Sequence, residues 1–153
     1  MRNISDLNIN DGGRLPSRPP ASSEVINDFE SEFEVELPEH YKSLLRSANG
    51  GHPELDSIDG GNGQFAINRF YHLTHEDRSS ESLWYATGHW RQILGVKAVP
   101  FANDGGGNQF FLDTRDTPAS VKLCLHDADM KIVLIADSFE EFIDSLEIDP
   151  DMI

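Results

Sequence analysis

Two amphipathic segments follow each other in the first third of the chain. The first, EVINDFESEF, has apolar residues at helical spacing, with Ser22 or Ser23 placed to cap its start. The second, PEHYKSLLRSAN, has an apolar face and ends at Asn49, Gly50 and Gly51, which tolerate the positive φ angles found after helices. The apolar residues of the two segments are Val25, Ile26, Phe29 and Phe33, then Tyr41, Leu44, Leu45 and Ala48. The pattern predicts two opening helices.

The middle of the chain changes to strand-like patterns. FAINRFYHL, which follows a glycine-rich loop, is rich in aromatic and β-branched residues and predicts a strand. ESLWYATGHW predicts a short helix with Gly88 in its interior. VKAVPFA and NQFFLDT flank the turn-forming NDGGG, VKLCLH follows, and the apolar run KIVLIA is typical of a strand covered on both faces. We expect these strands to form a meander.

A last helix closes the pattern. Ser138 and Glu141 form a capping box at its start, and its apolar stripe consists of Phe139, Phe142, Ile143 and Leu146. Helices at both ends of a run of strands indicate an α+β fold with a mostly antiparallel sheet, N-terminal helices and a closing C-terminal helix. No internal repeat is found.

Composition divides the chain into an arm and one domain. Residues 1–21 include RLPSRPP and lack apolar periodicity, so we expect a flexible N-terminal arm that is dispensable for folding. Residues 22–153 are enough for a single domain with a sizeable core. Cys124 cannot form an internal bridge because it is the one cysteine, and it lies in an apolar stretch typical of a small buried residue. A reducing, cytoplasmic location is therefore expected.

The formal net charge of −15 argues against nucleic-acid binding, which depends on clustered Lys and Arg. No stretch of the sequence is apolar enough to span a bilayer or to serve as a signal peptide, so we expect no membrane partner. The acids concentrate in residues 24–36 and 127–153. Such clusters form either a solvated, solubilising surface or an anionic face that attracts a basic protein.

Signals for catalysis, cofactors or metals are weak. The DGGGN segment leads into a strand rather than a helix, so a hairpin turn is favoured over a phosphate loop. His72 and His75 lack a second ligand pair for zinc, and Asp127 and Asp129 lack the rest of a calcium loop. Cys124 has no adjacent basic group to activate it. We therefore predict no catalytic, cofactor or metal site.

Aromatic and acidic residues are the candidates for a binding surface. Trp84, Tyr85 and Trp90 could anchor an interface, although core positions are the more common role of such residues. The acids of the closing helix could face a basic partner, as could the acid that opens the glycine turn. The predicted partner-binding residues are Glu140, Glu141, Asp144, Glu147, Trp84, Trp90 and Asp104.

Three blocks in this order resemble the SUKH superfamily, which includes bacterial immunity proteins and a fungal branch of cell-wall regulators. The blocks are LPEHYKSLLRSANGG, PFANDGGGNQFFLDT and IADSFEEFIDSL. The resemblance implies helices before a curved, mostly antiparallel sheet, a closing helix and no shared catalytic constellation.

The resemblance also implies a function. It indicates a protein-binding domain, and the leading hypothesis is an immunity protein that neutralises a cognate toxin, such as a nuclease or another enzyme with a basic groove. The alternative is a general regulatory interaction module without a toxin partner. A hydrolase or small-ligand protein is a third interpretation, which rests only on the histidine and glycine signals.

Overall fold

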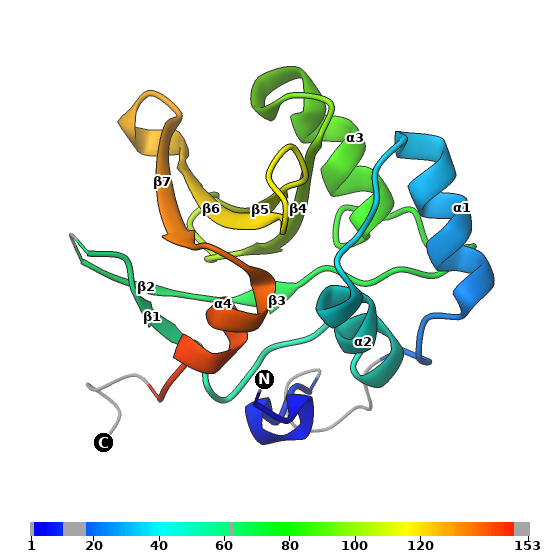
Figure 1. Ribbon diagram of the computed structural model, residues 1–153, viewed down its shortest axis with the longest axis horizontal. Coiled ribbons are helices and arrows are strands. Elements are labelled where there is room, and N and C mark those ends of the chain that lie inside the picture. Colours follow the sequence, from blue (N-terminus) through cyan, green and yellow to red (C-terminus); the bar gives the residue numbers. More distant parts are fainter. Residues whose placement is uncertain (1, 11–17, 62, 149–153) are drawn as a thin grey trace.

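A computed structural model describes residues 2–10, 18–61 and 63–148 of the chain (Figure 1). The helices are α1 (Ser23–Phe33), α2 (Glu39–Ser47), α3 (Leu83–Leu94) and α4 (Phe139–Ser145), with short 3-10 turns η1 (Ile4–Leu7) and η2 (His126–Ala128). The strands are β1 (Ser57–Asp59), β2 (Gln64–Ala66), β3 (Arg69–Phe70), β4 (Ala98–Asn103), β5 (Gln109–Asp113), β6 (Ser120–Leu125) and β7 (Lys131–Ala136).

Five strands form one antiparallel sheet in the order β3-β4-β5-β6-β7. The strands β1 and β2 form a separate antiparallel hairpin. The predicted α+β class, with helices before and after a mostly antiparallel sheet, is confirmed. The predicted strand over 65–73 is divided between β2 and β3, and α3 continues four residues past the predicted 81–90 segment.

Serine side chains fix the starts of three helices. Ser22 Oγ accepts a hydrogen bond from the Val25 N–H at 3.2 Å, and Ser82 Oγ accepts one from the Tyr85 N–H at 3.1 Å. Ser138 Oγ accepts one from the Glu141 N–H at 3.1 Å. Each bond satisfies a backbone donor that the helix itself leaves unpaired. The predicted caps of α1 and α4 are therefore confirmed.

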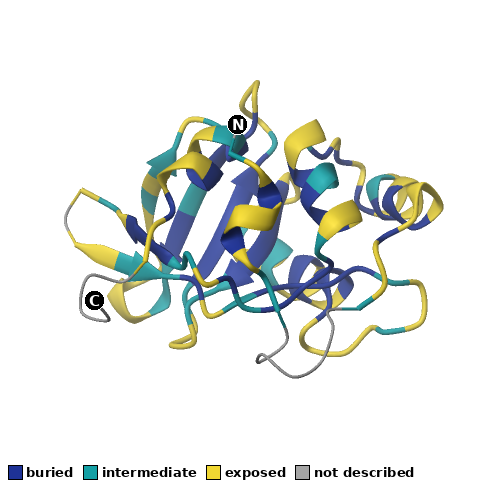
Figure 2. Ribbon diagram, turned by 90° about the horizontal axis from the view of Figure 1, so that it is seen from below, coloured by how far each residue is buried: buried dark blue, intermediate teal, exposed yellow. Residues whose placement is uncertain are grey.

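One face of the five-stranded sheet, here called the inner face, carries the main core. Its aromatic side chains pack edge to face with the helices beneath it: Phe101 contacts Phe139 and Phe142 with ring centroids 5.5 and 5.4 Å apart. Tyr41 of α2 lies 5.3 Å from Phe139. Figure 2, seen from below, shows the buried strands behind helices whose outward surfaces are exposed. The predicted stripe of α4 is thus the core contact of that helix.

The start of the chain differs from the expected flexible arm. Ile4 and Leu7 are buried members of the main core, because residues three apart lie on one side of a 3-10 turn. The Arg2 guanidinium donates to the carbonyls of Ile143 and Leu146 at the end of α4. A single turn is too short to show periodicity in sequence, which is why its contact with the core was not predicted. Most of the RLPSRPP segment lies outside the described residues.

β7 also differs from its prediction. It is the last strand of the sheet, and its side chains alternate between partly buried and exposed rather than being covered on both faces. Ile132 and Leu134 are 45% and 55% exposed. An apolar run looks the same in sequence whether its second face is covered or open, and here that face is open.

Candidate protein-binding face

The sheet face opposite the main core, here called the outer face, has only a small buried cluster. Its buried members are Ala98, Phe111 and Cys124, which form a cluster separate from the main core. Trp90 and Leu94 of α3 pack against this cluster. Figure 1 shows α3 beside β4 and β7 at the far end of the same sheet. The helix α3 and the strand β7 therefore border the outer face.

Exposed apolar side chains gather on these two bordering elements. Among the described residues, seven large apolar side chains are exposed, and six belong to α3, β7 or the residues next to them. We call these six, with Trp90, the α3–β7 face: Tyr85, Ile93, Val96, Met130, Ile132, Leu134 and Trp90. Exposed apolar groups that occur singly need no explanation, whereas grouping on one side is typical of interaction surfaces.

The helix side of this face is ordered by ring contacts. The Tyr85 and His89 rings stack with centroids 5.6 Å apart and planes at 9°. His89 in turn contacts Trp90 in a T-shaped arrangement at 5.7 Å. Tyr85, His89 and Ile93 follow one another at four-residue intervals and so share one side of the helix. α3 thus presents a preformed aromatic row rather than isolated side chains.

Cys124 lies beneath the strand side of the face. Its sulfur is 3.7 Å from the sulfur of Met130, and burial raises the pKa of the thiol. A raised pKa keeps the sulfur protonated, and a protonated thiol is a poor nucleophile and metal ligand. The prediction that Cys124 is a small buried apolar residue is confirmed.

The charged groups next to the face neutralise one another. The carboxylate of Asp113 accepts hydrogen bonds from Arg115 at 2.7 and 2.9 Å and from the Lys122 ammonium at 2.7 Å. These hydrogen bonds, that of Arg115 first, hold the pKa of Asp113 well below its ordinary range. Lys122 also lies 3.6 Å from Asp116. Two carboxylates and two cations therefore balance within this network.

Charge separates the two sides of the molecule. α3 and the strands β4 to β7 contain a single acidic residue, Asp113, together with Arg91, Lys122 and Lys131. α1 and α4 contain no basic residue and seven acids: Glu24, Asp28, Glu30, Glu32, Glu140, Glu141 and Asp144. Interface centres are depleted of charged residues, and the α3–β7 face meets that description better than α1 or α4 does.

The predicted acidic candidates lie at or after α4, and each has a contact within the chain. Glu140 lies 3.1 Å from His40 of α2, and a Glu141 oxygen accepts from the Asp137 N–H at 3.0 Å. Asp144 accepts from the Arg2 N–H, while the backbone of Glu147 bridges to that of Ser57. Because α2 lies between α1 and α4, the two acidic segments form two surfaces rather than one (Figure 1).

The remaining candidates have structural contacts. Trp84 is buried against Phe29 at 5.4 Å, and its indole N–H donates to the Thr74 carbonyl at 2.8 Å. The carboxylate of Asp104 accepts hydrogen bonds from the backbone N–H groups of Gly106 and Asn108, at 2.8 and 3.0 Å. Asp104 therefore holds the hairpin turn between β4 and β5. Trp90, unlike Trp84, borders the outer face, where it packs against the small buried cluster.

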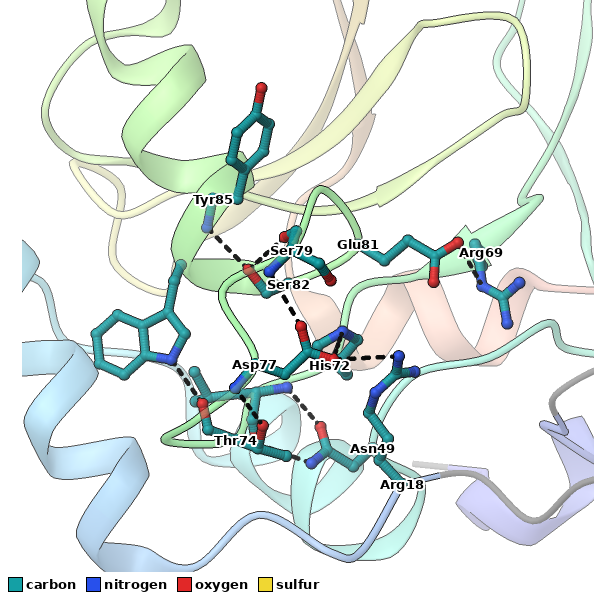
Figure 3. Close-up of polar contacts among 12 residues, drawn as sticks. Arg18, Asn49, Arg69, His72, Thr74, Asp77, Ser79, Glu81, Ser82 and Tyr85 are labelled. Carbon is teal, nitrogen blue, oxygen red and sulfur yellow. Dashed lines mark hydrogen bonds and ion pairs between the residues drawn. The ribbon is translucent and has the colours of Figure 1, made fainter.

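A polar cluster joins the end of α2 to the start of α3 (Figure 3). The Asn49 side chain donates to the Leu73 carbonyl and accepts from the Leu73 N–H, both at 2.8 Å. The Asp77 carboxylate lies 3.3 Å from Arg18 and 3.4 Å from the buried His72, whose pKa burial lowers. Each of these groups links two segments, so the cluster holds the end of α2 and the segment before α3 together.

His75 is separated from this cluster and lies on the surface. It contacts Asp28 of α1 at 2.9 Å, close to Glu24, and these exposed groups could approach one cation. One turn further along α1, Glu32 pairs with Arg78 at 3.6 Å. The two pairs dock the segment before α3 onto α1. The sequence pattern did not predict these pairs because the partners are far apart in the chain, 47 residues for His75 and Asp28.

Comparison with known proteins gives the family of the chain. No helix in the described part of the chain has the length and apolar character needed to cross a membrane. A search of curated proteins finds no match. The sequence profile of the SMI1 / KNR4 family (SUKH-1) matches residues 20–145, which spans α1 to α4 and all seven strands. A match to this family indicates a protein-interaction domain. The chain belongs to the SMI1 / KNR4 family (SUKH-1).

Proposed function

We propose that this chain is an immunity protein that neutralises a cognate toxin by direct binding, and that the α3–β7 face is the contact surface. The observation that carries the proposal is that, among the described residues, six of the seven exposed large apolar side chains belong to α3, β7 or the residues next to them. Membership of a family of interaction domains supports a protein as the occupant. The chain acts in this proposal by covering a site on its partner, without chemistry of its own.

The composition of the face suits a protein contact. Tyr, Trp and Met are enriched at interfaces, and the face offers Tyr85, Trp90 and Met130. The aromatic row on α3 is already ordered by its ring contacts. A preformed anchor loses less conformational entropy on binding than a flexible one. This arrangement supports tight association through few residues.

The acidic helices have a different role in the proposal. A toxin that handles nucleic acid has a basic groove, and the charge of −15 on this chain attracts it over distances of about 8–10 Å at physiological salt. Such attraction acts mainly on the rate of encounter, by roughly 10 to 10³ at low salt. The helices thus steer the partner while the apolar face retains it.

The test uses a toxin encoded beside the gene of this chain, with inhibition of its enzymatic activity as the readout. Ile93→Lys and Leu134→Lys together place two charges on the α3–β7 face, where the wild-type residues are 49% and 55% exposed. We expect the inhibition constant to rise at least about 100-fold, because two buried apolar contacts become unpaired charges. Thermal unfolding should change little, since both positions are exposed.

Ile148→Lys is the matched control. Ile148 is 43% exposed but lies outside the α3–β7 face, so the same substitution should leave inhibition unchanged. Equal losses in the control and the double variant would contradict the assignment of the face. A partner that binds the chain without losing its activity would favour the regulatory-module alternative.

A further inference from the structure

The two edges of the five-stranded sheet are finished differently. At the β3 edge, the Phe70 N–H donates to the Gly51 carbonyl at 2.8 Å and the Gly51 N–H donates to the Phe70 carbonyl at 3.2 Å. At the opposite edge, β7 pairs with β6 alone, and no backbone hydrogen bond joins its far side to another described residue. β7 therefore presents an open row of backbone donors and acceptors.

The guarding features of β7 lie near its two ends and leave the middle of its edge unprotected. Proteins commonly guard an open edge with proline, with charged side chains or with a bulge. β7 contains no proline, and its single charged residue, Lys131, is at its first position. The bulge lies at the other end, where the pairing with β6 shifts register after Leu134. Lys131–Leu134 is thus a regular, open stretch with Ile132 and Leu134 exposed beside it.

Acidic side chains lie at both ends of this stretch. Asp127 and Asp129 precede it, and Asp137 and Glu141 follow it; all four are exposed. The backbone edge between them carries apolar side chains. A segment that complements β7 would accordingly have an apolar centre and a basic residue near each end.

We propose that β7 binds its partner by strand addition: an extended segment of the partner pairs with Lys131–Leu134, packs apolar side chains on Ile132 and Leu134, and places Lys or Arg near the flanking acids. The proposal deepens the proposed function, on which it rests, by naming the mode of recognition. Main-chain hydrogen bonds supply affinity in this mode, and alternate side chains supply specificity. A second copy of this chain complements the edge less well, because each copy brings the same acids and a charge of −15.

The test is a selection from a phage-displayed library of random 12-residue peptides, panned on the whole chain. Peptides that also bind an Ile132→Lys/Leu134→Lys variant are removed first. Thermal unfolding of the variant verifies that it folds. We expect the selected peptides to alternate apolar and polar residues and to carry Lys or Arg near both ends. A synthetic copy of the best peptide should bind the variant at least 10-fold more weakly than the wild-type chain.

Backbone methylation separates strand addition from ordinary side-chain contact. An N-methylated copy of the peptide keeps every side chain but loses backbone donors, so its binding should fall at least 10-fold. Three results would overturn the proposal. The methylated copy could bind as tightly as the unmodified peptide, or the selection could yield no peptides that prefer the wild-type chain to the variant. The third result is selection of peptides whose apolar residues have helical spacing. A dimer that the Leu134→Lys substitution dissociates, detected by light scattering, would also overturn it by showing that β7 pairs with itself.

If the strand-addition proposal fails, the proposed function can still be tested separately. If Ile93→Lys alone abolishes toxin inhibition while Ile132→Lys does not, the partner contacts α3 and the strand-addition mode is wrong. Unchanged inhibition in both single variants and in the Ile93→Lys/Leu134→Lys double variant would refute the α3–β7 face as the contact surface. Absence of inhibition by the wild-type chain would refute the proposed function itself.

Discussion

The two faces of the sheet are built from similar apolar residues but differ in how far these residues are covered by the rest of the chain. The inner face is closed by α2, α4 and the η1 turn, and its aromatic side chains are fully buried. The outer face has a separate buried cluster of three apolar residues, Ala98, Phe111 and Cys124, and a border of exposed ones. Burial of apolar area stabilises the fold, so the inner face accounts for most of the stability. In the proposed function, the exposed apolar area that borders the outer face contacts the partner.

The largest expected difference in stability between the two faces is at Phe142. Phe142→Ala removes a fully buried ring that contacts Phe101, Phe110 and Phe139, so the free energy of unfolding should fall by about 3–5 kcal/mol. Urea denaturation followed by circular dichroism measures the loss. Leu134→Ala on the outer face is the control and should cost less than about 0.5 kcal/mol, as exposed positions usually do. Similar losses in the two variants would remove the distinction between the faces.

The second effect tests whether the N-terminal residues belong to the inner face. Leu7 is fully buried although it lies in the segment expected to be a dispensable arm. Leu7→Ala should cost about 2–5 kcal/mol because it leaves a cavity beside α2. Asp6→Ala on the exposed side of the same turn should cost little. A change below about 1 kcal/mol for Leu7→Ala, measured by thermal unfolding, would support the prediction that the N-terminal arm is dispensable for folding.

A third, smaller effect concerns the charge network beside the outer face. Asp113→Asn removes a buried carboxylate from Arg115 and Lys122 and should cost about 1–3 kcal/mol at pH 7. The pKa of Asp113 is lower in the folded chain than in the unfolded one. Its contribution is therefore complete above the ordinary carboxyl pKa of about 4 and is lost as pH falls through the lowered value.

Denaturation of wild type and Asp113→Asn at pH 7 and pH 3 provides the measurement. The wild-type chain should lose more stability than the variant between these values, because only the wild type binds an extra proton at Asp113 on unfolding. Asp116→Asn, at a position that is 49% exposed, is the control and should show a smaller difference. An equal pH dependence in wild type and Asp113→Asn would show that the network does not contribute.

The main core could be predicted from sequence because its signals are local. The helical spacing of α1, α2 and α4 and the caps at Ser22 and Ser138 follow from residues within one or two turns. The turn at Asp104 was also predicted from its glycines, since the backbone there requires positive φ at Gly105 and Gly107. In each case the pattern and the structure depend on the same short stretch of chain.

Of the α3–β7 face, Trp90 was among the predicted partner-binding residues and Tyr85 among the possible anchors. The other residues could not be predicted, because nothing local distinguishes them. Ile132 and Leu134 belong to an apolar run that would look the same in a central strand, and their exposure depends on where β7 lies in the sheet. Tyr85 and Ile93 are exposed only because α3 turns Leu83, Trp84 and Ala86 toward the core. Position in the sheet and orientation of the helix are set by contacts between distant segments, which a single sequence does not display.

The smallest expected effect concerns the acidic helices and acts on rates rather than on stability. Asp144→Lys with Glu147→Lys reverses two exposed charges at the end of α4. Association with a basic toxin should slow several-fold, and its dependence on salt should weaken, because exposed charges act mainly on encounter. Dissociation should hardly change if the α3–β7 face holds the complex. Stopped-flow association at two ionic strengths measures both rates.

Glu24→Lys with Glu36→Lys makes the same reversal in the segment of α1, which α2 separates from α4. Equal slowing in the two double variants would mean that net charge alone attracts the partner, whereas slowing at one site would show which helix faces the partner during encounter. Faster dissociation in the α4 variant would contradict the division of roles, since the acids would then lie within the contact itself. The apolar face would in that case share the interface with α4 instead of forming it alone.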